Sequence, residues 1–340
     1  MNIIHLEESF KLENGKTLTG LTIAYHTYGK LNEARDNVVW VCHALTANSD
    51  VFDWWAGIVG ENSVINPKDH FIICVNIIGS CYGSSGPLTI NPENNQPYYS
   101  SFPVVTIRDM IDSFILVRKK LGIEKVKLLM GGSMGGYQVL EWCLVEPDVI
   151  QNGFVITTSA AESAWGIAIH TAQRLAIEAD QTWKDRSADA GKNGIKAARG
   201  IGMLTYRNYK IFHQKQTDPD FSKTDNYKAS GYILHQGNKL SDRFNAQSYW
   251  LLTKSMDSHN IARGRFETLE DALKQIHQPI LVIGIDSDIL CPIPEQKFLA
   301  EHIPNSTLHI ISSDYGHDGF LVEVESISRH LFAWMEKHGV

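Results

Sequence analysis

The sequence lacks any long apolar run. No stretch of its 340 residues approaches the roughly 20 consecutive apolar residues that a membrane-spanning helix needs. Its first eight residues contain neither the basic segment nor the long apolar segment of a secretory signal peptide. We therefore expect a protein without a membrane anchor, and a cytoplasmic location is the simplest interpretation.

Cysteine is scarce and shows no regular spacing. The five cysteines form no Cys-x-x-Cys pair, and most of them lie in or beside apolar runs, at Cys42, Cys74, Cys81, Cys143 and Cys291. Buried, reduced cysteine is common in such surroundings. The pattern therefore argues against a disulfide framework and against a zinc site. We expect no metal and no bound cofactor.

Positive charge is in deficit. Lysine and arginine number 31 against 38 acidic residues, which gives a net charge of -7. This balance argues against nucleic acid and anionic membranes as partners, although a local site can carry the opposite sign. The chain is 43% hydrophobic and 20% charged, as is usual for a globular protein. Its length suits one large domain or a core with an insertion.

The sequence alternates short apolar runs with helical patterns. Residues 10–13 and 18–25, joined by Asn14-Gly15, are typical of a hairpin. Continuous apolar runs predict buried strands at 38–42, 71–75, 126–130, 154–156, 280–283 and 308–311. Helical spacing is found at 110–121, 137–145 and 322–337. The alternation predicts an α/β fold with a mostly parallel sheet covered on both faces.

Residues 161–277 interrupt this alternation. They contain no strong strand run, but helical patches at 167–179, 195–204 and 246–255 and a polar, charged stretch near 214–228. We predict a helical lid domain at 161–277, inserted into a core domain that comprises 1–160 and 278–340. The alternative is a second helical domain unrelated to the functional site.

The segment Gly131-Gly132-Ser133-Met134-Gly135 joins a predicted strand to a predicted helix. A Gly-x-Ser-x-Gly motif in this context places the serine on a sharp, strained turn, where small neighbours avoid clashes and the hydroxyl is exposed above the sheet. The helix that follows adds N–H groups and a favourable dipole. We therefore predict that Ser133 is a catalytic nucleophile. An ordinary glycine-rich turn is the alternative, and a phosphate loop is disfavoured because no Gly-Lys-Ser/Thr follows.

A serine nucleophile needs a base, and the base needs an orienting carboxylate. In the α/β-hydrolase fold these residues follow in the order serine, acid, histidine. Asp286 and Asp288 follow the strand at 280–283, and His317 follows the strand at 308–311. We predict that His317 is the base and Asp288 the acid, with Asp286 as its rival.

The oxyanion of the reaction needs backbone donors. In this fold one is the N–H after the nucleophile, here that of Met134, and the other comes from a loop after an early strand. The loop at 43–46 has that position, and Leu45 is its expected donor. Loss of one such donor typically costs about 100- to 1000-fold in rate.

Fold and triad leave the reaction open among esterases, lipases, peptidases and acyltransferases. The sequence resembles the homoserine O-acetyltransferases of methionine biosynthesis almost from end to end. The matching stretches are 25–29, 42–46, 76–87, 102–103, 106–110, 131–136, 205–207, 243–244, 287–290 and 316–318. The run at 76–87 and the Gly-His-Asp at 316–318 are more specific than the serine motif alone.

This resemblance implies an α/β-hydrolase that works by a ping-pong reaction. Acetyl-CoA, a co-substrate rather than a cofactor, would acylate the serine, and the hydroxyl of L-homoserine would then take the acetyl group. By the same resemblance, Arg207 would hold the homoserine carboxylate, Asp318 would receive its ammonium, Asp288 would be the acid, and the protein would be a homodimer. Relatives that use succinyl-CoA or serine leave a succinyltransferase open, and an esterase or thioesterase is a further alternative.

Overall fold

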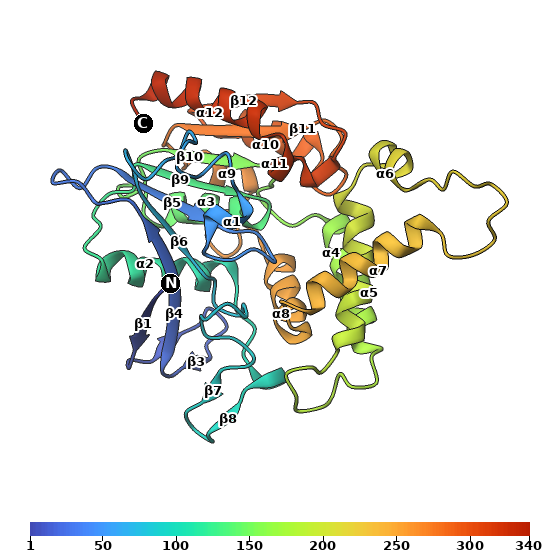
Figure 1. Cartoon of the computed structure of the whole chain (residues 1–340). Coiled ribbons are helices and arrows are strands. Elements are labelled where there is room, and N and C mark those ends of the chain that lie inside the picture. The colour runs from blue at the N-terminus through green and yellow to red at the C-terminus, as the bar shows by residue number, and fades with distance from the viewer.

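The computed structural model describes all residues, 1–340, and its centre is one sheet of eight strands (Figure 1). Strand β4 runs antiparallel to both of its neighbours, whereas the strands from β6 to β12 in the sheet are parallel. In spatial order the strands are β1 (Asn2–Leu6), β4 (Leu21–Tyr28), β6 (Phe71–Val75), β5 (Val38–Cys42), β9 (Leu128–Gly132), β10 (Gly153–Ile156), β11 (Ile280–Ile285) and β12 (Ser306–Ile311). The predicted α/β fold is confirmed.

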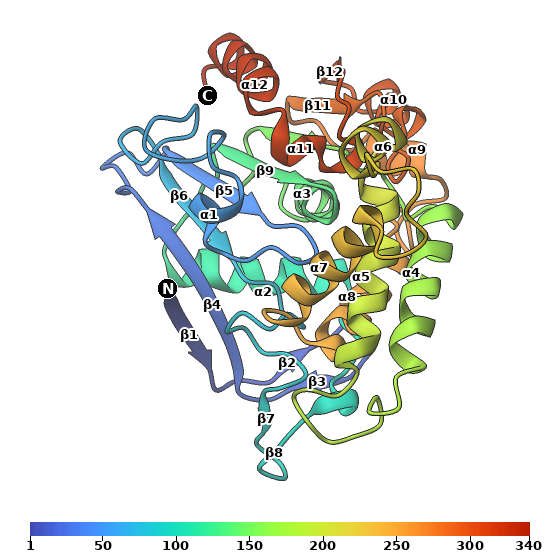
Figure 2. The ribbon, with the colours of Figure 1, turned by 45° about the vertical axis from the view of Figure 1, so that its right-hand side comes forward.

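Helices cover both faces of this sheet (Figure 2). Successive side chains of a strand point to opposite faces, so on β5 Trp40 packs beneath α2 (Ile107–Lys120) and α3 (Met134–Val145), and Val39 and Val41 pack on the other side. That other side is covered by α1 (Val51–Trp54), α11 (Gly319–Val322) and α12 (Val324–His338), and α10 (Ile293–His302) packs on the side of α2 and α3. Both faces are thus buried, which explains the continuous apolar runs of the central strands.

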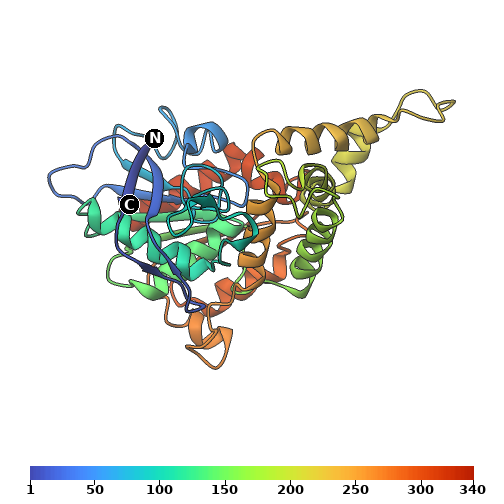
Figure 3. The same ribbon diagram turned by 90° about the horizontal axis from the view of Figure 1, so that it is seen from below.

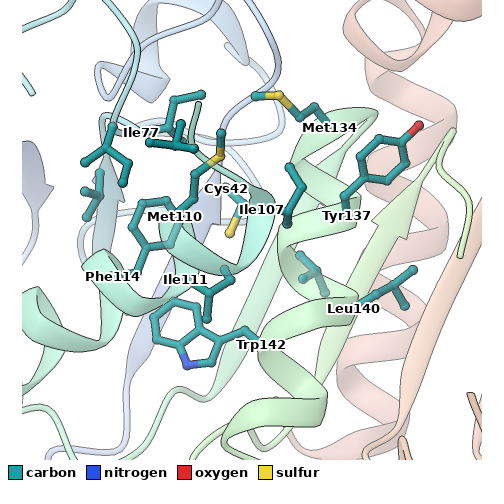
Figure 4. Close-up of a cluster of buried hydrophobic side chains, with 14 of the residues drawn as sticks. Cys42, Ile77, Ile107, Met110, Ile111, Phe114, Met134, Tyr137, Leu140 and Trp142 are labelled. Atoms are coloured by element: carbon teal, nitrogen blue, oxygen red, sulfur yellow. The ribbon is translucent and has the colours of Figure 1, made fainter. Parts of the chain in front are cut away.

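Figure 4 shows how α2 and α3 meet above the sheet. The apolar side chains of α2 recur with helical spacing, at Ile107, Met110, Ile111 and Phe114, and they lie on the side of α3 that carries Met134 and Trp142. Burial of each such side chain is worth about 1.5–3 kcal/mol. A capping box at Thr106 and Asp109 begins α2. This packing fixes the helix that follows the serine motif.

Between β10 and β11 the chain forms a group of helices beside the sheet (Figure 1). These are α4 (Ala164–Glu178), α5 (Lys192–Tyr206), α6 (Tyr209–Gln216), α7 (Lys228–Ser241) and α8 (Ala246–Asp257), whereas the short α9 (Leu269–Leu273) packs against the core near α10. Helices α6 and α7 were not predicted. The connection between them projects away from the rest of the molecule (Figure 3).

The residues that lead from these helices back to β11 are bonded to the core. An isolated antiparallel bridge joins Ala161 to Asn260. Beyond it, the Arg265 guanidinium donates to both carboxylate oxygens of Glu141, a buried residue of α3, at 2.8 and 2.7 Å. Paired, charge-assisted hydrogen bonds of this kind are strong and directional. The helical segment is therefore anchored to the helix that carries the serine motif.

The first 30 residues differ from the predicted hairpin. Short strands β2 (Phe10–Lys11) and β3 (Thr17–Leu18) do form a hairpin, but the chain breaks at Gly20 and begins β4 as a separate strand. The unpredicted β1 pairs with β4. A second small hairpin consists of β7 (Ile90–Asn91) and β8 (Gln96–Pro97), followed by a 3-10 turn at Tyr99–Ser101. No helix is both long and apolar enough to span a membrane.

Candidate active site

Ser133 lies between the end of β9 and the start of α3, with φ 54° and ψ -127°. A positive φ is costly for a non-glycine residue and persists only where the surroundings enforce it. The chain enforces it because β9 and α3 are both packed against the core on either side of this one residue. The strained turn predicted from the motif is therefore present.

Glycines on both sides of Ser133 allow the chain to fold this tightly. A Cβ at Gly131 would lie 2.5 Å from the carbonyl carbon of Gly135, and a Cβ at Gly135 would lie 2.2 Å from the carbonyl oxygen of Cys42. Both distances are far inside van der Waals contact, and the atoms that would be struck are backbone atoms. The motif thus needs glycine because strand, helix and the neighbouring β5 approach one another closely.

The three predicted catalytic side chains meet at the carboxyl edge of the sheet. His317 Nε2 lies 2.9 Å from Ser133 Oγ, and His317 Nδ1 lies 2.8 Å from Asp288 Oδ2. Serine, histidine and aspartate come from the ends of β9, β12 and β11, which are separated in sequence but close in a parallel sheet. All three are buried. This is the geometry in which a histidine takes the serine proton while the carboxylate orients the imidazole.

The structure distinguishes the two candidate acids. Asp288 Oδ1 accepts hydrogen bonds from the N–H groups of Leu290 and Cys291 at 2.8 and 3.0 Å, which leaves Oδ2 for His317. Asp286 instead accepts from the N–H of Ser313 at 3.1 Å and so joins the ends of β11 and β12. The structure therefore places Asp288, and not its rival, against the base.

The pKa of His317 is raised above its ordinary value of 6.5. Burial alone would lower this pKa, but the charge of Asp288 and the hydrogen bond to it favour the imidazolium and outweigh burial. A base with a raised pKa accepts the serine proton more readily. It also becomes protonated, and inactive as a base, at a higher pH than a free histidine.

The loop after β5 is held next to the nucleophile. The Ile77 N–H donates to His43 Nε2 at 3.1 Å, so His43 Nδ1 carries the proton and donates to the Ala44 carbonyl at 2.9 Å. Burial lowers the pKa of His43 to about 4, which keeps its ring neutral. Gln138 of α3 donates to the His43 carbonyl at 3.1 Å. The loop is thereby locked to the serine helix.

Both predicted oxyanion donors are N–H groups without an acceptor in the protein. The Leu45 N–H donates to no acceptor in the protein, and Leu45 lines the cavity above Ser133. Met134 is the first residue of α3, and the first N–H groups of a helix have no acceptor within the helix. Neither group needs to give up a partner in order to stabilise a developing negative charge.

Ser133 and His317 open into a cavity of about 660 Å³. One side of it is formed by the loop at 44–48, and the other by side chains of the helical segment, namely Ile169, His170, Gln173, Arg199, Tyr206, Lys239 and Met256. A cavity of this size suits a small molecule. The helical segment thus contributes to the wall of the catalytic cavity, which disfavours the alternative of a helical domain unrelated to the site.

The predicted substrate-binding pair differs in position. Asp318 lines the cavity, whereas Arg207 does not line it but pairs with Asp318, with Nε 3.3 Å from Oδ2. Arg199 does line the cavity, and its guanidinium lies 5.4 Å from the centroid of the Tyr206 ring. The sequence analysis missed Arg199 and Tyr206. They lie seven residues apart on α5, which places both side chains on one face, but the helix predicted at 195–204 ended before Tyr206.

Burial raises the pKa of Asp318, and the nearby Arg207, Arg199 and His317 partly oppose this. A carboxylate with two guanidinium groups nearby remains a suitable partner for an ammonium group only if it is ionised, which these cations favour. The neighbourhood of Asp318 therefore combines both signs of charge within one cavity wall.

One group of side chains has the composition of a metal site. Asp288, Cys291 and His317 each offer a ligand atom, and these atoms lie within 4.8 Å of one another. However, Asp288 is hydrogen-bonded to His317 and His317 to Ser133, and burial holds the pKa of the Cys291 thiol well above its usual range. The hydrogen bonds indicate that two of these three residues serve the triad.

Comparison with known proteins agrees with the fold. A family model for the alpha/beta hydrolase fold matches residues 37–324. A homoserine O-acetyltransferase structure from Bacillus anthracis superimposes with a TM-score of 0.91, covers 98% of this chain and 96% of its own, and is 22% identical in sequence. At that identity the likeness shows the fold alone.

Sequence comparison is more specific. A homoserine O-acetyltransferase from Cyclobacterium marinum is 42% identical over 338 residues, which cover 99% of this chain and 96% of the relative. Another from Trichormus variabilis is 44% identical over 328 residues, which cover 96% and 91%. The chain belongs to the homoserine O-acetyltransferase family. The resemblance found in the motifs is thereby confirmed.

Proposed function

We propose that this protein transfers an acetyl group from acetyl-CoA to the hydroxyl of L-homoserine, which yields O-acetyl-L-homoserine and CoA for methionine biosynthesis. The observation that supports this most strongly is the identity of over 40% to homoserine O-acetyltransferases along nearly the whole chain. The cavity adds a chemical reason, because its wall carries both a cation, Arg199, and a carboxylate, Asp318. An α-amino acid presents the complementary pair of charges.

In the first half-reaction Ser133 Oγ attacks the thioester carbonyl carbon while His317 Nε2 takes the hydroxyl proton. The carbonyl oxygen becomes an oxyanion and receives hydrogen bonds from the N–H groups of Leu45 and Met134. When the tetrahedral intermediate collapses, the C–S bond breaks, and the imidazolium of His317 gives its proton to the CoA thiolate. The products are free CoA and an acetyl ester on Ser133.

In the second half-reaction the homoserine hydroxyl replaces the thiol. His317 removes the hydroxyl proton, the oxygen attacks the acetyl carbon, and collapse returns the proton to Ser133. Arg199 on the cavity wall would bind the carboxylate of homoserine, and Asp318 would bind the ammonium. Arg207, which the resemblance suggested for the carboxylate, would instead act through its ion pair by keeping Asp318 ionised and in place.

Transfer must compete with hydrolysis of the acetyl-serine. The helical segment supports transfer because α4, α5, α7 and α8 all contribute side chains to the wall around Ser133. A covered site limits access of water, and charged groups that hold the acceptor raise its effective concentration. A lipase or a thioesterase could have the same cover, so the reaction products must decide between acyl transfer and hydrolysis.

The test is release of CoA from acetyl-CoA, with and without L-homoserine. We expect one rapid equivalent of CoA per active site without acceptor, and sustained release only when homoserine is added. Rapid sustained release in water alone would indicate a thioesterase. Parallel reactions with succinyl-CoA and with L-serine, analysed by mass spectrometry, identify the preferred donor and acceptor, for which we expect acetyl and homoserine.

We also propose that the protein forms a homodimer through the helical segment. Several large apolar side chains there are exposed, namely Leu175, Leu204, Tyr209, Phe221 and Leu234. Exposed apolar side chains on one region are typical of an interface. Light scattering should give twice the mass of the 38.1 kDa chain, and the paired substitutions Leu204→Glu and Leu234→Glu should give a monomer. A native protein that is monomeric at micromolar concentration would refute the proposal.

A further inference from the structure

Gln173 is a buried polar side chain in the wall of the catalytic cavity. It lies on α4, is only 1% exposed, and neither its Nε2 nor its Oε1 has a hydrogen-bond partner within 3.5 Å. A buried amide without partners costs about 1–3 kcal/mol for each group. Buried polar groups in native proteins are nearly always paired, so such a side chain on a cavity wall indicates a ligand that completes it.

The neighbours of Gln173 share this property. The Nε of Arg199 and the hydroxyl of Tyr249 are also buried without a partner. At Gly202 on α5, an added Cβ would lie 3.1 Å from Gln173 Nε2 and 3.1 Å from Tyr206 Cε2, so the amide and the ring converge above this glycine. The guanidinium of Arg199 lies over the same tyrosine ring. The amide thus belongs to the charged part of the wall.

An amide can complement both charges of an α-amino acid at once. Its N–H donor and its carbonyl acceptor lie on one carbon atom, just as the carboxylate and the ammonium of the amino acid lie on one carbon atom. A carboxylate can accept several hydrogen bonds, so Arg199 and Gln173 can both donate to it. The ammonium has three hydrogens and can therefore donate to Asp318 and to Gln173 together.

We propose that Gln173 is a specificity-determining residue of the acceptor site, where its Nε2 donates to the carboxylate and its Oε1 accepts from the ammonium of the acceptor amino acid. This inference rests on the proposed function and assigns to that function a residue that neither the motifs nor the triad identifies. It predicts that the protein selects acceptors that carry both charged groups.

The experiment separates the two half-reactions in Gln173→Met, which keeps a similar volume and removes both polar atoms. We expect the rapid equivalent of CoA release to be unchanged, and kcat/KM for L-homoserine to fall about tenfold to a hundredfold, the usual range for one or two hydrogen bonds to charged groups. For 3-aminopropan-1-ol, which lacks the carboxylate, and for 4-hydroxybutyrate, which lacks the ammonium, the fall should be clearly smaller.

Gln173→Glu is expected to have opposite effects on two acceptors. The substitution keeps an acceptor oxygen but replaces the N–H donor by a negative charge. It should therefore be worse than Gln173→Met for L-homoserine, because the carboxylate is repelled, yet better than Gln173→Met for 3-aminopropan-1-ol, because the ammonium is attracted. Equal effects of either variant on all acceptors would overturn the proposal.

The matched control is Gln247→Met. Gln247 on α8 is also a buried glutamine with an unpaired Oε1, but it does not line the cavity. The Gln247→Met substitution should leave the relative kcat/KM values for the three acceptors unchanged. If Gln247→Met reproduces the effects of Gln173→Met, or if Gln173→Met slows acylation as much as transfer, the assigned role is wrong. A native protein that gives no acetyl transfer to homoserine would instead overturn the proposed function itself.

Discussion

The two walls of the catalytic cavity differ in how far their polar groups are satisfied. On the side of the sheet, both oxygens of Asp288 and both ring nitrogens of His317 have partners within the protein. On the side of the helical segment, Gln173 and the Nε of Arg199 have none. The acid and the base are therefore satisfied by the protein itself, whereas the side chains of the helical segment would be satisfied only by a ligand.

This difference indicates a division of work. Groups that carry out bond making are most effective when they are fixed in advance, because no energy is then needed to reorganise them during the reaction. Groups that recognise a substrate gain most when the substrate supplies the missing partner. The sheet would therefore determine the chemistry, and the helical segment would determine which acceptor receives the acetyl group.

The largest expected effect lies on the wall formed by the sheet. Ser133→Ala should lower CoA release about a millionfold, since loss of the nucleophile alone removes most of the benefit of a triad. Stopped-flow CoA release and thermal unfolding should show a lost burst with an intact fold. A variant that retains substantial turnover with both substrates would mean that the acyl-serine route is wrong.

Asp288→Asn should be the next largest effect. It leaves the shape of the site intact but removes the charge that orients and stabilises the imidazolium, and a loss of about 10⁴-fold in kcat is typical. Asp286→Asn is the matched control and should stay within a few-fold, because Asp286 bonds only to the backbone of Ser313. Comparable losses for the two variants would contradict the assignment of the acid.

The next predictions compare Arg199 and Arg207, the two arginines near Asp318, by their effect on the use of homoserine. Arg199→Met should lower kcat/KM for homoserine about tenfold to a hundredfold through KM and leave the acylation burst unchanged. Arg207→Met should have a smaller effect, because Arg207 pairs with Asp318 but does not line the cavity. If Arg207→Met raises the KM for homoserine more, the role that the resemblance suggested for Arg207 holds and that of Arg199 does not.

The smallest effect is a shift in pH dependence. His317 must be neutral to act as base, and its pKa is raised, so the acylation rate should fall with decreasing pH through a midpoint above 6.5. In Asp288→Asn the imidazolium loses its partner, so this midpoint should move to lower pH. If the burst rate of the native protein falls with a midpoint below pH 6.5, then the charge of Asp288 does not outweigh the effect of burial on the pKa of His317.

Some of the site could be predicted from single segments. The motif at 131–135 implied a strained Ser133 because strand, turn and helix are consecutive in sequence. His317, and an acid at either Asp286 or Asp288, followed from the rule that parallel strands end at one edge. Asp286 could not be separated from Asp288 in this way, since the two lie two residues apart and only the turn after β11 directs one of them toward His317.

The sequence by itself determined the family, the α/β fold, Ser133 and His317, because local pattern and chain order encode them, and it limited the acid to Asp286 or Asp288. Tertiary structure alone decided which side chains of the helical segment reach the cavity. Arg199 and Gln173 lie on different helices, and their meeting depends on how α4 packs against α5, which no motif records. Packing between distant segments sets which polar atoms are left without partners, and here these atoms mark the proposed acceptor site.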